Sequence, residues 1–171
     1  FNKPVIAIKN KIESGQFGKF VLGTVRLRWC RPQRYYDLAP WRGTFSHDGG
    51  ALTNQGIHHV DLLRYLGGEV LKVNSTMRTL GAKIEVEDSV VATFVLQNKA
   101  IGSLEVTTAA RPIDYEASIS VLGSKGMAQI GGLAVNELQI FSIKPSECKK
   151  HSEKIPNTLG LGHKNFYDKL K

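Results

Sequence analysis

A run of short segments with the alternating pattern of β-strands fills the second half of the chain and most constrains its fold. In YEASISVL (115–122), for example, apolar side chains alternate with Glu116, Ser118 and Ser120. Asn98-Lys99 and Ser124-Lys125 occupy the turns of two hairpins. Because hairpins pair successive strands antiparallel, we expect a largely antiparallel sheet with one open face. The expected strands cover residues 69–80, 87–97, 100–108, 114–122, 126–131 and 135–143.

The first half of the chain adds helices to this sheet. Val5, Ile8 and Ile12 share one side of an amphipathic helix that ends at Gly15. A strand is expected over about 20–30, an irregular loop over 31–48, and a helix over 49–68 between two glycine pairs. Residues 144–160 have the pattern of a loop or linker, and a last helix begins near 162. We expect one α+β domain over residues 1–171, with a large, mostly antiparallel sheet and helices on one face.

Composition is that of a globular protein, with 42% hydrophobic residues among 171. The sequence contains no run of about 20 apolar residues and no zinc-binding cysteine motif. Since Cys30 and Cys148 cannot form a disulfide scaffold, we expect a cytoplasmic protein. Since no apolar run is long enough to span a bilayer, we expect no membrane partner. The net charge of +8 favours anionic partners such as nucleic acid, phosphorylated metabolites or an acidic domain.

The helix expected over 49–68 carries unusual polar side chains in its first half. Residues four apart on a helix share a face, so Asn54 and His58 are expected to point together into one cleft. An imidazole there suits general acid–base catalysis, because its ordinary pKa of about 6.5 lies near neutrality. Asn54 could orient a substrate hydroxyl or the imidazole tautomer. The structural alternative is that both side chains satisfy nearby backbone groups, and His59 is expected to pack in the core or hydrogen-bond at an interface.

Two other functional interpretations are weaker. A metal site could combine His58 and Asp61 with His47 or Asp48, but no ligand motif of known geometry is completed. A nucleic-acid-binding module could stack bases on aromatic residues. Its candidate residues are Trp29, Tyr35, Tyr36 and Trp41. The lysines and arginines are dispersed, however, and no aromatic RNA-binding strand motif is present. A third possibility is a non-catalytic oligomerisation domain built on the open sheet.

Residues 49–70, GGALTNQGIHHVDLLRYLGGEV, resemble the signature helix of the Gfo/Idh/MocA oxidoreductases. Residues 1–29 resemble the first helix and strand after that family's nucleotide domain, and GSKGMAQI (123–130) resembles its glycine-flanked hairpin. The resemblance implies the C-terminal half of such an enzyme, with the N-terminal Rossmann domain for NAD or NADP absent from this chain. Consistent with that, the sequence has no Gly-x-Gly-x-x-Gly run.

The same resemblance assigns roles to particular residues. The family's catalytic histidine maps onto His58, and its acidic residue four positions earlier maps onto Asn54, which cannot act as a base. The catalytic lysine of the family lies in the absent domain. The resemblance also implies dimers or tetramers formed through the open sheet.

RWCRPQRYYDLAPWRGTF (28–45) and NQGIHHVDLL (54–63) are most similar to dehydrogenases that oxidise UDP-N-acetylglucosaminuronate at the sugar 3-hydroxyl. Such a substrate needs guanidinium groups for its pyrophosphate and carboxylate, and aromatic faces for its rings. The expected substrate-binding residues are therefore Arg31, Arg34, Tyr35, Tyr36, Trp41 and Arg42. His163 resembles a histidine near the family's sugar pocket, and the resemblance implies that it binds substrate as well.

Overall fold

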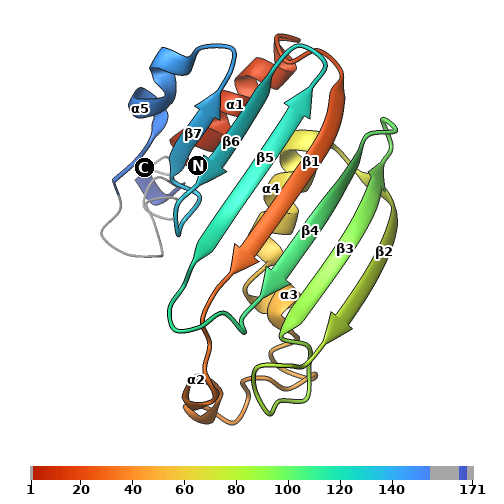
Figure 1. The fold of residues 1–171 in the computed structure, drawn as a ribbon, viewed down its shortest axis with the longest axis vertical. Coiled ribbons are helices and arrows are strands. Elements are labelled where there is room, and N and C mark those ends of the chain that lie inside the picture. Colours follow the sequence, from red (N-terminus) through yellow and green to blue (C-terminus); the bar gives the residue numbers. More distant parts are fainter. Residues whose placement is uncertain (1, 155–165, 169–171) are drawn as a thin grey trace.

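The structure, a computed structural model, describes residues 2–154 and 166–168. Within them lies a seven-stranded sheet of order β2-β3-β4-β1-β5-β6-β7 (Figure 1). Every strand predicted from the sequence is confirmed, and so is the mostly antiparallel pairing. The strands are β1 (Phe20–Arg28), β2 (Val70–Arg78), β3 (Ser89–Leu96), β4 (Ile101–Thr107), β5 (Glu116–Gly123), β6 (Met127–Gly131) and β7 (Glu137–Phe141).

Helices cover one face of this sheet, as expected. The helices α1 (Lys3–Glu13), α3 (Ala51–Asn54) and α4 (Ile57–Gly67) lie behind the strands in Figure 1. Val25 and Leu27 of β1 point toward them and are fully buried, in register with Leu104 and Val106 of β4. No helix among the described residues has the length and apolar character needed to span a bilayer.

The exception to antiparallel pairing is the contact between β1 and β4, which run parallel. Parallel neighbours need a long crossover connection, since a tight turn can join only antiparallel strands. Here the crossover contains α2 (Gln33–Asp37), α3, α4 and the β2–β3 pair. The C-terminal ends of β1 and β4 therefore meet at one end of the sheet, beside α2 and α3 (Figure 1).

The prediction of a single helix over 49–68 is wrong, because this segment forms two helices, α3 and α4. The N–H of Gly56 donates five residues back to Ala51, and helical bonding restarts when the Gly56 carbonyl accepts from His59 and Val60. A side chain at position 56 would crowd the Leu52 carbonyl and the methyl groups of a β4 valine, and these neighbours would have to move by a few tenths of an ångström to admit it.

Two predicted loops contain short helices. The loop predicted over 31–48 contains α2, which Pro32 precedes in an extended conformation. A helical repeat needs several buried side chains at helical spacing. This five-residue helix buries only Tyr36, so its sequence shows no such repeat. The loop predicted over 144–160 begins with η1 (Pro145–Glu147) and α5 (Cys148–His151). Of the predicted last helix, residues 166–168 are described and are helical.

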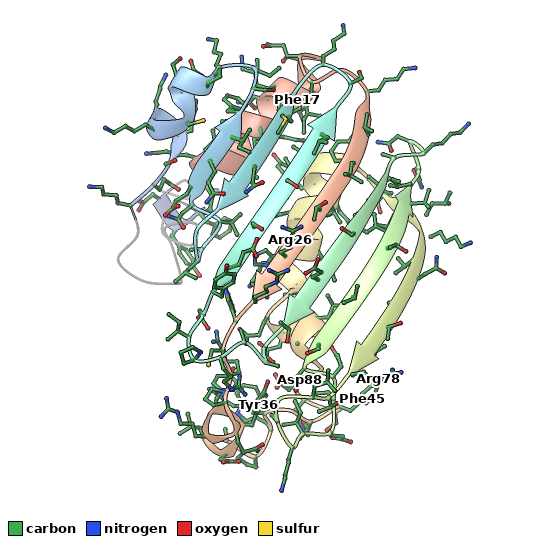
Figure 2. The ribbon with its side chains drawn as sticks, viewed as in Figure 1. Phe17, Arg26, Tyr36, Phe45, Arg78 and Asp88 are labelled. Carbon is green, nitrogen blue, oxygen red and sulfur yellow. The ribbon has the colours of Figure 1, made fainter. Side chains whose placement is uncertain are left out.

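The face of the sheet opposite the helices carries a balanced set of charges. Arg28 on β1 bonds Glu105 on β4 at 2.5 Å and Glu116 on β5 at 3.2 Å. Arg26, on the same face, lies 3.7 Å from Glu105 (Figure 2). Ser118 donates to Glu116 at 2.6 Å. Two cations and two anions thus compensate one another across three neighbouring strands.

A buried carboxylate fixes the loop between β2 and β3 against the helices. Asp88, fully buried and labelled in Figure 2, accepts hydrogen bonds from the backbone N–H groups of Leu80, Gly81 and Ala82. The adjacent Glu87 accepts from the N–H of Ala51 through its carbonyl and from that of Leu52 through its carboxylate. The loop therefore holds the first turn of α3.

We predict that Asp88→Ala lowers the free energy of unfolding by roughly 2–4 kcal/mol, because it leaves several buried N–H groups without acceptors. Urea-induced unfolding measures the change. Asp61→Ala, at an exposed position of α4, is the matched control and should change stability by less than about 0.5 kcal/mol. Equal effects of the two substitutions would contradict the role of Asp88.

Candidate substrate-binding site

A cavity of about 690 Å³ lies where the chain leaves β1. It brings together three of the residues predicted to bind substrate, Arg31, Arg34 and Tyr35. Segments far apart in sequence complete its wall, since it includes one residue from the end of α3 and three from the loop before β5. The other lining residues are Cys30, Pro32, Leu38, Gln55, Pro112, Ile113, Asp114 and Leu133.

Arg31 is held from several sides. Its guanidinium lies 5.0 Å from the ring centre of Trp29 and 5.4 Å from that of Tyr35, within cation–π range. Its Nη1 donates to Asp114 Oδ1 at 2.9 Å, and its Nη2 to Gln55 Oε1 at 3.4 Å. The same Asp114 oxygen accepts from the backbone N–H of Cys30 at 2.7 Å. Arg31 therefore has a fixed orientation and a compensated charge.

Arg34 differs from Arg31 in both respects. It is solvent-exposed on α2 and lines the same cavity. Within residues 2–154 and 166–168, its guanidinium makes no ion pair or hydrogen bond, so its charge is available to a ligand.

Gln55 connects the cavity to α3. Its amide nitrogen donates to the Tyr35 hydroxyl at 3.3 Å and to the Asn54 side-chain oxygen at 2.8 Å. The Asn54 amide nitrogen donates in turn to Asp48, whose other carboxylate oxygen accepts from the N–H of Gly43. Gln55 is not among the residues predicted from the sequence, because the expected helix register favours residues 54 and 58 within the same polar run.

Asn54 and His58 lie on different helices, so the helical spacing that was expected to align them does not apply. Asn54 is engaged by Asp48 and Gln55. His58 is exposed in the first turn of α4, and its imidazole forms no hydrogen bond with another described residue. Neither residue is among those that line the cavity. His58 is exposed to solvent, Asn54 supports Gln55 at the cavity wall, and the catalytic role of both stays a prediction.

The remaining predicted residues are placed differently. Tyr36 is buried, its hydroxyl lies 2.9 Å from that of Thr108, and burial raises its pKa. Arg42 stacks 4.0 Å from the ring centre of Tyr35 and 5.2 Å from that of the half-exposed Trp41. None of these three lines the cavity, and their contacts with substrate stay predictions. His163 lies outside the described residues.

His59 packs in the core, as one of its two predicted roles required. It is 3% exposed and meets the Trp29 ring edge-on at 6.3 Å between ring centres. Burial, with a smaller contribution from the neighbouring His58, lowers the pKa of its imidazole to about 4. Neither ring nitrogen has a hydrogen-bond partner in the part of the chain that the structure describes. His59 is therefore neutral at pH 7.

Comparison with known proteins identifies the family. Residues 5–129 match the GFO/IDH/MocA C-terminal domain, and the chain belongs to this family. It is 43% identical to the WlbA dehydrogenase of Bordetella pertussis, whose crystal structure is a complex with NADH and UDP-GlcNAcA. The TM-score of that match is 0.79, and it covers 81% of this chain and 43% of that one.

Two further relatives agree with this assignment. The WlbA dehydrogenase of Chromobacterium violaceum, also crystallised with NADH and UDP-GlcNAcA, is 37% identical with a TM-score of 0.87 over 99% of this chain and 48% of that one. The uncharacterized yeast protein YMR315W is 30% identical over 99 residues, which are 57% of this chain and 28% of that protein. The chain thus spans less than half the length of each of these relatives.

We predict that the pKa of His59 makes the fold sensitive to acid. The unfolded chain binds a proton near pH 6.5 and the folded chain near pH 4, so stability falls as the pH drops between these values and is unaffected by this group above them. The full decrease in the free energy of unfolding is about 3 kcal/mol. Urea unfolding of wild type and His59→Phe from pH 7.5 to 4 measures it.

The pH dependence of His59→Phe should be correspondingly shallower. His47→Phe, at an exposed position, is the control and should keep the wild-type profile. Parallel pH profiles for wild type and His59→Phe would contradict the prediction.

Proposed function

We propose that this chain is the substrate-binding and catalytic half of an NAD(P)-dependent dehydrogenase that oxidises a UDP-linked N-acetylhexosaminuronate at its 3-hydroxyl. The observation that carries the proposal is the cavity lined by Arg31, Arg34 and Tyr35, in a chain 37–43% identical to two dehydrogenases crystallised with UDP-GlcNAcA. In this proposal residues 1–171 form one domain and a separate N-terminal Rossmann domain completes the enzyme.

The cavity has the chemistry that such a substrate requires. Guanidinium groups form paired, charge-assisted hydrogen bonds with phosphate and carboxylate oxygens. The tyrosine ring offers an aromatic face to a sugar or uracil. Its volume of about 690 Å³ falls within the range of small-molecule sites, about 300–1,000 Å³.

In the proposed reaction, His58 acts as the base. The C3–H bond breaks with transfer of a hydride, the hydroxyl O–H bond breaks with transfer of its proton to the imidazole, and a C=O bond forms at C3. Removal of that proton avoids an unfavourable protonated ketone and contributes roughly 100- to 10,000-fold to the rate. Asn54, held by Asp48, keeps Gln55 in place at the cavity wall.

A nicotinamide cofactor would supply the hydride acceptor at C4 of its ring. The described residues fit the substrate side of this chemistry, with an exposed imidazole and a cationic cavity, whereas the glycine-rich dinucleotide motif is absent from the sequence. We therefore assign cofactor binding mainly to the other domain, and we expect this chain to be inactive by itself.

The structure does not favour nucleic acid as an alternative ligand. A stacking surface would need Trp29, Tyr35, Tyr36 and Trp41 to be available together. Tyr36 is buried, and Trp29 packs between His59 and Arg31. Stacking on successive bases requires exposed ring faces.

A second proposal concerns assembly. We propose that the open face of the sheet binds a second copy of this chain, because it combines the self-compensating charges of β1, β4 and β5 with exposed apolar side chains. Val91 of β3 is 59% exposed and Ile101 of β4 is 55% exposed on that face. A face with balanced charge can meet its own copy without net repulsion.

The catalytic proposal is tested with the chain joined to its nucleotide domain. Wild type should oxidise UDP-GlcNAcA with NAD⁺ or NADP⁺, followed by absorbance of the reduced nicotinamide. His58→Asn should lower kcat roughly 100- to 10,000-fold with little change in KM, because the base acts in the transition state. His47→Asn, at an exposed position away from the cavity, is the control. Absence of wild-type turnover, or a His58 variant of nearly wild-type kcat, would contradict the proposal.

The assembly proposal is tested by light scattering. Val91→Arg combined with Ile101→Arg should convert a dimer or tetramer to smaller species, because four or more cations would then face one another. The control, Val73→Arg, replaces a 55% exposed valine of β2 whose partner in register is the buried Phe94, on the other face. A wild-type monomer, or an unchanged mass in the double variant, would refute the role of this face.

A further inference from the structure

The two arginines of the cavity have different electrostatic surroundings. Arg31 is paired with Asp114, and both side chains are less than one-fifth exposed. Arg34 is exposed and has no anionic partner within the described part of the chain. With one carboxylate and two guanidiniums in its lining, the cavity presents a single uncompensated positive charge.

We infer that Asp114 determines the charge specificity of the cavity and that Arg34 binds one anionic group of the ligand. This inference rests on the proposed function and deepens it. An anion that approaches Arg31 must compete with an existing ion pair and is repelled by the Asp114 carboxylate. An anion that approaches Arg34 meets neither obstacle, so the lining selects where the ligand's charge is placed.

The geometry separates the charge of Asp114 from its structural contacts. Its Oδ1 accepts from both the Cys30 backbone N–H and Arg31. An asparagine can keep an acceptor oxygen in that place while it loses the negative charge. Arg31 also retains its contacts with the rings of Trp29 and Tyr35. Asp114→Asn is therefore expected to leave the shape of the cavity unchanged and to raise the net charge of its lining by one.

A residue with a merely structural role would weaken ligand binding when it is replaced. A charge-selecting residue has the opposite effect, because its removal frees the Arg31 guanidinium for an anion. The direction of the change in affinity thus distinguishes the two roles. Arg34→Gln removes the uncompensated charge and must weaken binding.

The test is isothermal titration calorimetry of the chain joined to its nucleotide domain with UDP-GlcNAcA and with UDP-GlcNAc, at about 50 mM salt to limit screening. Asp114→Asn should lower Kd for UDP-GlcNAcA roughly three- to tenfold, and Arg34→Gln should raise it by a similar factor. Arg34→Gln will weaken the binding of UDP-GlcNAcA alone if Arg34 binds the carboxylate. It will weaken the binding of both ligands if Arg34 binds the pyrophosphate. Either pattern supports the inference and identifies the group.

Matched controls make the same charge changes elsewhere. Glu137→Gln on β7 and Arg78→Gln on β2 lie at exposed positions outside the cavity, and should leave both Kd values within twofold of wild type. Thermal unfolding confirms that each variant is folded. Weaker or unchanged binding in Asp114→Asn, or unchanged binding in Arg34→Gln, would overturn this inference alone. If the wild-type protein binds neither ligand, the proposed function and this inference are both overturned.

Discussion

The parallel pairing of β1 with β4 is the constraint on which the rest of the molecule depends. It requires a long crossover between two adjacent central strands, and the chain uses that crossover to place α2 and α3 beside their C-terminal ends and α4 along the covered face of the sheet (Figure 1). This crossover brings the arginine-rich segment that follows β1 against the end of α3. The loop before β5 reaches the same segment because β1 lies between β4 and β5 in the sheet. The cavity results from this connection, because its walls come from segments that no local turn could join.

Buried and half-buried carboxylates give this end of the molecule its rigidity. Asp88 holds the loop that supports α3, Asp48 holds Asn54, and Asp114 holds Arg31. Each carboxylate also accepts a hydrogen bond from at least one backbone N–H group, which lies in the same loop for Asp88 and Asp48 and in the segment after β1 for Asp114. A site on loops thus acquires the fixed geometry that binding requires.

Much of the fold could be predicted from the sequence, because the strands alternate cleanly and the hairpin turns have characteristic residues. The break at Gly56 could not be predicted, since a single glycine weakens a helix without necessarily ending it, and the close contact with β4 is visible only in the fold. Arg31, Arg34 and Tyr35 were found from chemistry and family resemblance, and they do share one cavity. Asp114 could not be found, because 83 residues separate it from Arg31. Gln55 was visible in a polar run, but its role became clear only once the helix was seen to be broken.

We propose that this cavity binds the sugar nucleotide through Arg34 while Asp114 remains the partner of Arg31. A crystal structure of the chain with bound UDP-GlcNAcA tests it most directly. We expect an anionic oxygen of the ligand within about 3 Å of the Arg34 guanidinium, and an Arg31–Asp114 pair that is still intact. A ligand that binds outside this cavity, or that replaces Asp114 as the partner of Arg31, would contradict it.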